Sequence, residues 1–235
     1  TWSEPCAIVD SYLLAFKLWE HTGKLKFLED AHLIWYNAIC HAQRANGGFG
    51  CDACPGEASG PDIRVRIEEA HWCCSMRGAE GLATAVKSLA YSIDGSVYLT
   101  GFHEGVLLVD ETQLKISSDY PFSGKLELEV LQGKIKADQL KIFIPHWMKL
   151  DTQKPLEDGF LVVDETLREG EKLVVSYSFE PREESCINVE NTSDNVVRKL
   201  VGPLVLDEFD KPIYHIMNKE VSKTTDYRRR ILHQK

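Results

Sequence analysis

Seven cysteines are the residues of this sequence with the clearest capacity for chemistry. They stand at positions 6, 40, 51, 54, 73, 74 and 186. A chain of 235 residues does not need disulfides to be stable, and two adjacent cysteines rarely bridge to each other without strain. Metal ligands, reactive thiols and buried free thiols are therefore the interpretations to weigh.

One candidate metal site joins the Glu-x-Cys motif near the start of the chain to the adjacent cysteine pair. Its ligands are Glu4, Cys6, Cys73 and Cys74. Zinc binds thiolates and carboxylates in a tetrahedral shell, and ligands zero to four residues apart can share one ion because the chain needs only a local turn. These residue types and spacings permit a zinc site with one carboxylate and three sulfur ligands.

A second candidate site uses Cys51 and Cys54 with the same adjacent pair. Its Cys-x-x-Cys half has a spacing common in structural zinc sites, whereas its directly adjacent half departs from the usual pattern. Cysteines that hold no metal remain a third interpretation. Spacing alone leaves the three alternatives open.

Composition and charge limit the classes of molecule that this protein is expected to bind. The apolar fraction is 43%, the formal net charge is −9 and the isoelectric point is near 5.4. Nucleic acids and anionic membranes favour a clustered basic surface, and the one basic run, residues 228–230, is interpreted as a solvated tail. No apolar stretch approaches the ~18 residues that span a bilayer. We expect a soluble protein without nucleic-acid or membrane partners.

The elements that must position the cysteines are predicted to be helical. Apolar residues recur at three- and four-residue spacing over 8–20 and 25–42, which predicts an antiparallel helix pair, and a third helix is expected over 76–92. Between them, residues 43–68 contain many glycines and prolines and are expected to form a long loop. Long loops in compact domains are often functional, and the cysteines within this loop favour a functional role for it.

After residue 94 the pattern changes to short alternating runs. In residues 125–130, Leu126, Leu128 and Val130 alternate with charged residues, which places three apolar side chains on one face of a strand. Further strands are expected at 97–99, 106–109, 140–144, 160–163, 173–179 and 196–206. Short strands separated by turn signals such as Asp158-Gly159 indicate a β-sandwich. We therefore predict a helical segment over 1–94 and a β-sandwich domain over 95–235.

Six short segments, in order along nearly the whole chain, carry a resemblance to a known family. They are SEPCA (3–7), LIWYNA (33–38), HWCC (71–74), DYPFSGK (119–125), FIPHW (143–147) and GPLV (202–205). The set resembles the β-L-arabinofuranosidases of glycoside hydrolase family 127 and their relatives. The resemblance implies a mixed α and β multidomain fold, in which the C-terminal helices of an (α/α)6 barrel precede an antiparallel β-sandwich.

The resemblance also implies roles for the candidate ligands. Zinc is expected on Glu4, Cys6, Cys73 and Cys74, with Cys73 as the nucleophile of a retaining hydrolysis of L-arabinofuranosides or related plant-polysaccharide sugars. Fixing the thiol as a thiolate makes it a competent nucleophile. The alternative is a carbohydrate-binding or zinc-stabilised structural module without turnover.

A retaining scheme also needs a general acid and base. In the family that glutamate precedes the Glu-x-Cys motif, so its equivalent is expected before Thr1. Because the sequence starts without Met, we expect a piece of a longer protein or a processed product. Its partners would be a carbohydrate substrate and either the N-terminal part of the barrel or a second copy. Reduced cysteines favour the cytoplasm over the periplasm.

Residues near the motifs have two interpretations each. His71 could contact a sugar hydroxyl or be structural, and Trp2 and Trp72 could stack on a sugar or pack in the core. Glu68 and Glu69 could supply an acid, although a solvated loop face is preferred. Family members commonly have prolines after the cysteine pair. Residues 75–78, SMRG, depart from that pattern and leave the substrate open.

Overall fold

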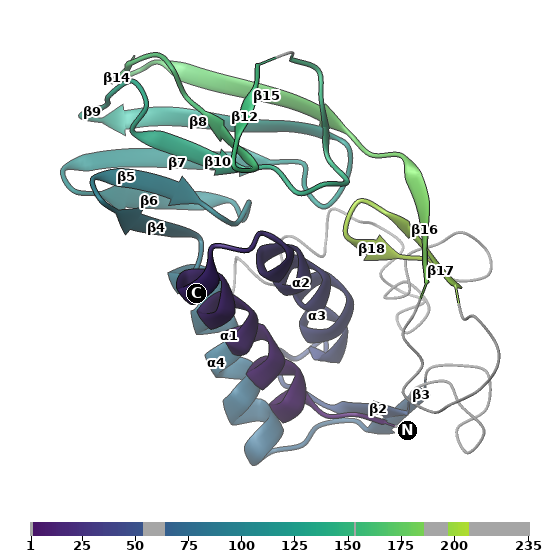
Figure 1. Ribbon diagram of the computed structural model, residues 1–235. Coiled ribbons are helices and arrows are strands. Elements are labelled where there is room, and N and C mark those ends of the chain that lie inside the picture. Colours follow the sequence, from purple (N-terminus) through teal and green to yellow (C-terminus); the bar gives the residue numbers. More distant parts are fainter. Residues whose placement is uncertain (1, 54–63, 153, 186–196, 207–235) are drawn as a thin grey trace. The chain divides into compact units, whose positions relative to one another are not determined.

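The computed structural model describes residues 2–53, 64–152, 154–185 and 197–206 (Figure 1). The chain has a mixed α and β fold and divides into two compact units. The helical unit comprises residues 1–84 and 181–235, and the sheet unit comprises residues 85–180. The predicted domain boundary lies between residues 94 and 95, and the two compact units meet between residues 84 and 85. Residues 181–206 also group with the helices and not with the preceding strands.

The helices of the first unit follow the expected order. They are α1 (Pro5–Thr22), α2 (Lys26–Ile34), a π-helical turn η1 (Trp35–Ile39), α3 (Cys40–Ala42) and α4 (Cys73–Lys87). Helix α1 ends at Gly23, which has a φ of 66° and donates its N–H to the Trp19 carbonyl at 2.8 Å. The expected helix over 76–92 begins instead at Cys73 and ends at Lys87, because residues 90–93 form a strand.

Aromatic packing joins α1 to the π-helical turn. The Tyr12 and Phe16 rings lie 5.1 Å apart, and the Tyr12 and Trp35 rings lie 5.7 Å apart. Helix α4 approaches α1 closely, since a Cβ on Gly81 would lie 2.9 Å from Cγ2 of Val9. A glycine inside a helix costs about 1 kcal/mol relative to alanine. Here it permits the close approach of the two helices that carry the candidate ligands.

Two small sheets complete the helical unit. Strands β1 (Trp2–Ser3), β2 (Cys51–Ala53) and β3 (Arg64–Ile67) pair in that order, so part of the expected loop is extended sheet. Strands β16 (Pro181–Ser185), β17 (Val197–Val201) and β18 (Leu204–Val205) form the other sheet. The single strand expected over 196–206 is instead a hairpin that turns at Gly202, where φ is 57°.

The side chain of Asn37 fastens strand β18 to the π-helical turn. Its amide donates hydrogen bonds to the carbonyls of Leu33 at 2.9 Å and Pro203 at 2.7 Å. Its oxygen accepts a bond from the Val205 N–H at 2.8 Å. The amide therefore supplies hydrogen bonds to β18 in addition to those from its partner strand β17. This contact helps explain why the hairpin of β17 and β18 belongs to the helical unit.

The sheet unit has two five-stranded sheets, which lie in two layers (Figure 1). The first has the order β12 (Leu156–Glu157), β13 (Phe160–Val162), β10 (Leu140–Phe143), β5 (Ser96–Leu99) and β4 (Ala90–Ile93). The second has the order β11 (Lys149–Leu150), β15 (Lys172–Ser178), β8 (Gly124–Gln132), β7 (Thr112–Ser118) and β6 (Gly105–Val109). Strands β9 (Lys134–Ile135) and β14 (Leu167–Arg168) pair separately.

One pair in the first sheet differs from expectation. Strands β5 and β10 are parallel, so the prediction of a wholly antiparallel arrangement is wrong at this pair. The segment between them contributes β6, β7 and β8 to the other sheet before it returns. A long connection of this kind lets two neighbouring strands run in the same direction.

The alternation predicted in β8 is present. Leu126, Leu128 and Val130 are buried, while Lys125, Glu127 and Lys172 form ion pairs on the other face. Two-residue hairpins at Asp94-Gly95 and Asp158-Gly159 have positive φ at both positions, as type I′ turns require. Among the described residues, no helix is long and apolar enough to cross a membrane.

Candidate metal centre

Glu4 and Cys6 are placed by the start of helix α1. Pro5 occupies the first helical position, which suits a residue without an N–H, and Glu4 precedes it with extended backbone angles of −124° and 119°. The Glu4 carboxylate makes no capping hydrogen bond to the helix. It is exposed, and Cys6, the second residue of α1, is half-buried, so both side chains are available at the same helix end.

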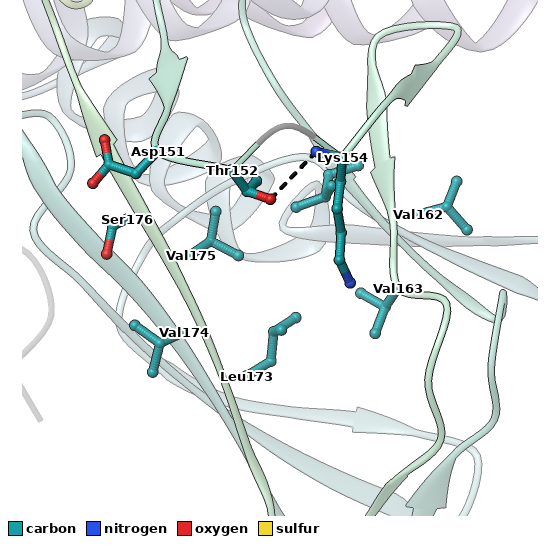
Figure 2. Close-up of a pocket in the computed structure, with 10 residues that line it drawn as sticks. Asp151, Thr152, Lys154, Val162, Val163, Leu173, Val174, Val175 and Ser176 are labelled. Atoms are coloured by element: carbon teal, nitrogen blue, oxygen red, sulfur yellow. Dashed lines mark hydrogen bonds between the residues drawn. The ribbon is translucent and has the colours of Figure 1, made fainter.

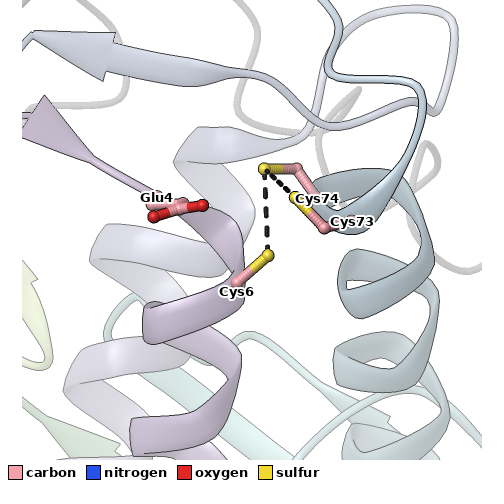
Figure 3. A group of neighbouring side chains, drawn as sticks. All are labelled: Glu4, Cys6, Cys73 and Cys74. Atoms are coloured by element: carbon pink, nitrogen blue, oxygen red, sulfur yellow. Dashed lines mark hydrogen bonds between the residues drawn. The ribbon is translucent and has the colours of Figure 1, made fainter.

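Cys73 and Cys74 form the first turn of helix α4. Successive side chains on a helix point about 100° apart. Cys74 therefore points inward and is only 2% exposed, whereas Cys73 is exposed. Figure 3 shows the two thiols on one helix facing Glu4 and Cys6 on the other. The adjacent pair thus offers one buried and one accessible sulfur.

All four predicted ligands come together in the structure. Their ligand atoms lie within 4.8 Å of one another. The Sγ atom of Cys74 lies 3.8 Å from that of Cys73 and 4.0 Å from that of Cys6. Zn–S bonds of about 2.3 Å in a tetrahedral shell place two sulfurs roughly 3.8 Å apart. The donor set and its spacing therefore fit a zinc ion.

Two opposing influences act on the protonation of the thiols in the cluster. The N-termini of α1 and α4 converge here, and their partial positive charges stabilise thiolates and carboxylates. Burial is the main cause that raises the pKa of the Cys6 thiol and the pKa of the Cys74 thiol. Binding of a divalent cation would offset that effect, because metal ligation requires the deprotonated thiol.

Cys51 is a further thiol at this site. It lies on β2, is 2% exposed, and its Sγ atom is 3.7 Å from the Sγ of Cys74. The pairing of Ser3 with Asp52 between β1 and β2 brings Cys51 beside the start of α1. Cys54, the other half of the second predicted site, lies outside the described residues. The second predicted site had combined Cys51 with Cys74, although the sequence gave no sign of the β1–β2 pairing that accompanies their approach.

A buried charged network supports the strand that carries Cys51. The Arg44 guanidinium donates to the Asp52 carboxylate at 2.8 Å and to the Cys51 carbonyl at 3.3 Å. Nε2 of His41 lies 3.4 Å from the same carboxylate. Burial lowers the pKa of His41, opposed by Asp52 and assisted by Arg44. A Cβ on Gly50 would lie 2.5 Å from Nε of Arg44, so only glycine fits there.

The segment before α4 is held against that helix by Phe49. A Cβ on Gly78 would lie 2.2 Å from the Phe49 ring, so the glycine leaves room for the ring one turn beyond the cysteine pair. The Phe49 carbonyl also accepts the N–H of Ala70 at 2.9 Å. Arg77 of α4 forms an ion pair with Asp10 of α1. These contacts fix the relative position of the two helix ends.

The other residues singled out in the sequence lie around the cluster without joining it. Trp72 is 84% exposed, and the His71 side chain is 73% exposed. The Glu69 carboxylate accepts a bond from the Asn46 amide at 2.9 Å and lies 3.6 Å from Nδ1 of His71. Glu68 is exposed. Trp72 therefore does not pack in the core formed by the described residues, and the Glu69 carboxylate is engaged by Asn46 and His71.

A separate cavity of about 210 Å³ lies in the sheet unit between β13 and β15 (Figure 2). Its described lining is mostly aliphatic and contains no aromatic ring. The ammonium group of Lys154 at its rim is paired with Asp164 at 2.6 Å. The cavity therefore lacks the convergent polar groups that mark a ligand site.

Three solved structures with a similar fold are glycoside hydrolases. A β-arabinofuranosidase of family GH127 matches with a TM-score of 0.67 and 17% identity, over 87% of this chain and 37% of its own. A second glycoside hydrolase gives 0.67 and 17%, over 86% and 37%. A GH127 β-L-arabinofuranosidase from Geobacillus stearothermophilus T6 gives 0.58 and 15%, over 87% and 36%.

These matches establish a shared fold. The chain spans a little over a third of the length of these proteins, 36–37%. Scans against models of protein families and against curated proteins give no match.

Proposed function

We propose that this chain carries the metal-binding and nucleophilic part of a retaining glycosidase that acts on L-arabinofuranosides or related plant-polysaccharide sugars. One observation carries the proposal. Four ligand atoms from residues 4, 6, 73 and 74 converge within 4.8 Å at two helix N-termini. They do so in a chain whose fold matches part of a β-arabinofuranosidase. Neither the cluster nor the fold would support the activity alone.

The proposed roles of the four residues follow from how exposed their side chains are. Glu4, Cys6 and Cys74 would hold a zinc ion together with Cys73, which is the exposed thiol of the set. When bound, zinc supplies the positive charge that keeps thiols deprotonated at neutral pH. Cys73 attacks the anomeric carbon of the sugar and forms a thioglycosyl intermediate, which water then hydrolyses. Cys73 thus takes the role that a second carboxylate has in most retaining enzymes.

The leaving oxygen must also be protonated. Among the described residues, the cluster itself contains one carboxylate, Glu4, and it is assigned to the metal. The resemblance to family 127 assigns the general acid and base to a glutamate before Thr1. We therefore propose that the activity belongs to a longer protein. Its carbohydrate-enclosing barrel would include α1 to α4, and its β-sandwich would include the two five-stranded sheets.

The decisive experiment replaces the proposed nucleophile in the complete protein. Cys73→Ala should lower kcat on an aryl L-arabinofuranoside by at least about 10³-fold, because no thiolate remains to form the covalent intermediate. Cys40→Ala, which removes a buried cysteine outside the cluster, is the matched control and should retain turnover. Full turnover by Cys73→Ala, or a product of inverted configuration, would contradict the proposal.

A structural zinc site without turnover is the second candidate, and the 3.7 Å distance between Cys51 and Cys74 favours it. In that case Cys51 replaces Glu4 as the fourth ligand. The two candidates differ in which variant loses the metal. Glu4→Gln should weaken zinc binding under the glycosidase proposal, while Cys51→Ser should not. The opposite result, measured by competition with a chromophoric chelator, would favour the structural site.

A further inference from the structure

Cys74 is the common neighbour of three other thiols. Its Sγ atom lies 3.7 Å from Cys51, 3.8 Å from Cys73 and 4.0 Å from Cys6. Two of these partners belong to the candidate metal set, and Cys51 does not. The cluster therefore contains one more thiol than the metal requires, in contact with a ligand.

We propose that Cys51 and Cys74 form a reversible disulfide when the metal is absent, and that this bond controls loading of the site. The inference rests on the proposed metal site, because it assigns Cys74 to both the metal and the disulfide. It adds a modification site and a redox dependence that the glycosidase proposal does not contain.

Geometry favours Cys51 over the other two partners of Cys74. A disulfide between Cys73 and Cys74 would join adjacent residues and store strain. The contact with Cys6 is the longest of the three, at 4.0 Å. The Sγ atoms of Cys51 and Cys74, at 3.7 Å, have the shortest separation of the three pairs to close to the about 2.05 Å of a disulfide. Cys51 is also held in place by β1 and β3, which flank its strand.

The exposed Cys73 gives an oxidant access to this buried pair. A peroxide oxidises the Cys73 thiol to a sulfenic acid and releases water. The Cys74 thiol displaces the hydroxyl group, which leaves as a second water, and a transient Cys73–Cys74 disulfide forms. Cys51 then attacks the Cys74 sulfur, and Cys73 regains its thiol. In sum, two thiols and one peroxide yield one disulfide and two waters.

The disulfide and the metal exclude each other. With Cys74 bonded to Cys51, only Glu4, Cys6 and Cys73 remain of the candidate ligand set. The site then lacks the buried thiolate that completes its tetrahedral shell, so its affinity for zinc should fall. Conversely, a metal-bound Cys74 is less available for thiol exchange. Both cysteines are 2% exposed, so reductants reach the bond slowly once it has formed. The disulfide would prevent a metal-free site from binding zinc until a reductant converts Cys51 and Cys74 back to thiols.

The test uses the complete protein with Cys54 and Cys186 replaced by alanine, so that oxidation products are simple to assign. Metal-free protein is treated with two equivalents of hydrogen peroxide and digested, and cross-linked peptides are identified by fragmentation mass spectrometry. We expect a Cys51–Cys74 cross-link, loss of zinc uptake and recovery of uptake with dithiothreitol. Zinc-loaded protein should oxidise at least about tenfold more slowly, because the bound thiolate is shielded.

Two variants make the result specific. Cys51→Ser cannot form the cross-link and should accumulate the Cys73–Cys74 disulfide in its place, whereas Cys40→Ala should behave as the parent does. In the parent, a dominant cross-link from Cys74 to Cys6 or Cys73, or equal oxidation rates with and without zinc, would overturn the inference. Zinc uptake is measured separately on reduced protein. If reduced protein forms the cross-link on oxidation yet never binds zinc, the proposed function fails and the disulfide assignment stands.

Discussion

The metal centre and the second five-stranded sheet are stabilised in different ways. The centre contains features that oppose local stability: glycines at 78 and 81 inside a helix, a helix start without a side-chain cap and the buried charge of Asp52. The sheet has strict alternation in β7 and β8, with apolar residues inward. Local rules tend to be broken where function requires it. The contrast therefore points to the helical unit as the functional one.

The largest expected effect is that of metal removal, which should destabilise the helical unit and leave the sheet unit unchanged. Zinc held at about 1,000 times its dissociation constant stabilises the folded state by roughly 4 kcal/mol, and only the helical unit carries the ligands. A chelator should reduce hydrogen-exchange protection at the first turns of α1 and α4 and leave β7 and β8 unchanged. Equal loss of protection in both units would break the contrast.

The sheet should respond instead to loss of apolar volume. Leu128 is fully buried in β8, and Leu128→Ala should lower the free energy of unfolding by about 3 kcal/mol through lost burial and the cavity left behind. Val174→Ala on β15, where the side chain is 50% exposed, is the control and should cost less than about 0.5 kcal/mol. Denaturant titration measures both. Zinc affinity should be the same in both variants.

Sequence patterns predicted these two regions with different success. The alternation of Leu126, Leu128 and Val130 and the Asp-Gly turns predicted strands and turns of the sheet unit, because both signals are local. Strand β7 was missed although Leu114 and Ile116 are buried and alternate with Lys115 and Ser117, which is the same period-two signal that predicted β8. The contact of Cys51 with Cys74 depends on pairing between strands that begin at residues 2 and 51, and no local pattern specifies such pairing.

The site residues illustrate the same limit. Spacing permitted Glu4, Cys6, Cys73 and Cys74 to meet, but left other combinations equally open. The resemblance to a family selected among them, and the structure shows the convergence. The role of Asn37 was predicted neither by spacing nor by the resemblance. It was quoted only as part of a motif, and its contact with strand β18 depends on a tertiary arrangement that residues 33–38 alone do not determine.

An intermediate effect is expected at Asn37, which joins the strand hairpin to the helices. Asn37→Ala removes bonds to Pro203 and Val205 and leaves their backbone groups without that partner. Each such bond contributes about 0.5–1.5 kcal/mol, so the free energy of unfolding should fall by about 2 kcal/mol. Asn46→Ala, at an exposed position, should have a smaller effect. Matching losses would show that β18 is not fastened by this side chain.

The smallest effect concerns the pH response of the helical unit. Burial lowers the pKa of His41, so its native state binds a proton less readily than the unfolded chain, whose histidine pKa is about 6.5. Stability linked to His41 is therefore complete above that value. It declines as the pH falls toward the folded-state pKa, by less than about 1.4 kcal/mol per pH unit.

His41→Gln tests this dependence because glutamine does not titrate. Between pH 7.5 and 5.5, unfolding free energies from denaturant titration should fall less steeply for the variant than for the parent. The difference should be confined to the acidic end of that range, since the parent gains its extra unfolded-state proton only there. Asp52 opposes the decline by attracting the proton, and Arg44 reinforces it. If the plots of unfolding free energy against pH were parallel for the parent and the variant, protonation of His41 would not contribute to the pH dependence of stability.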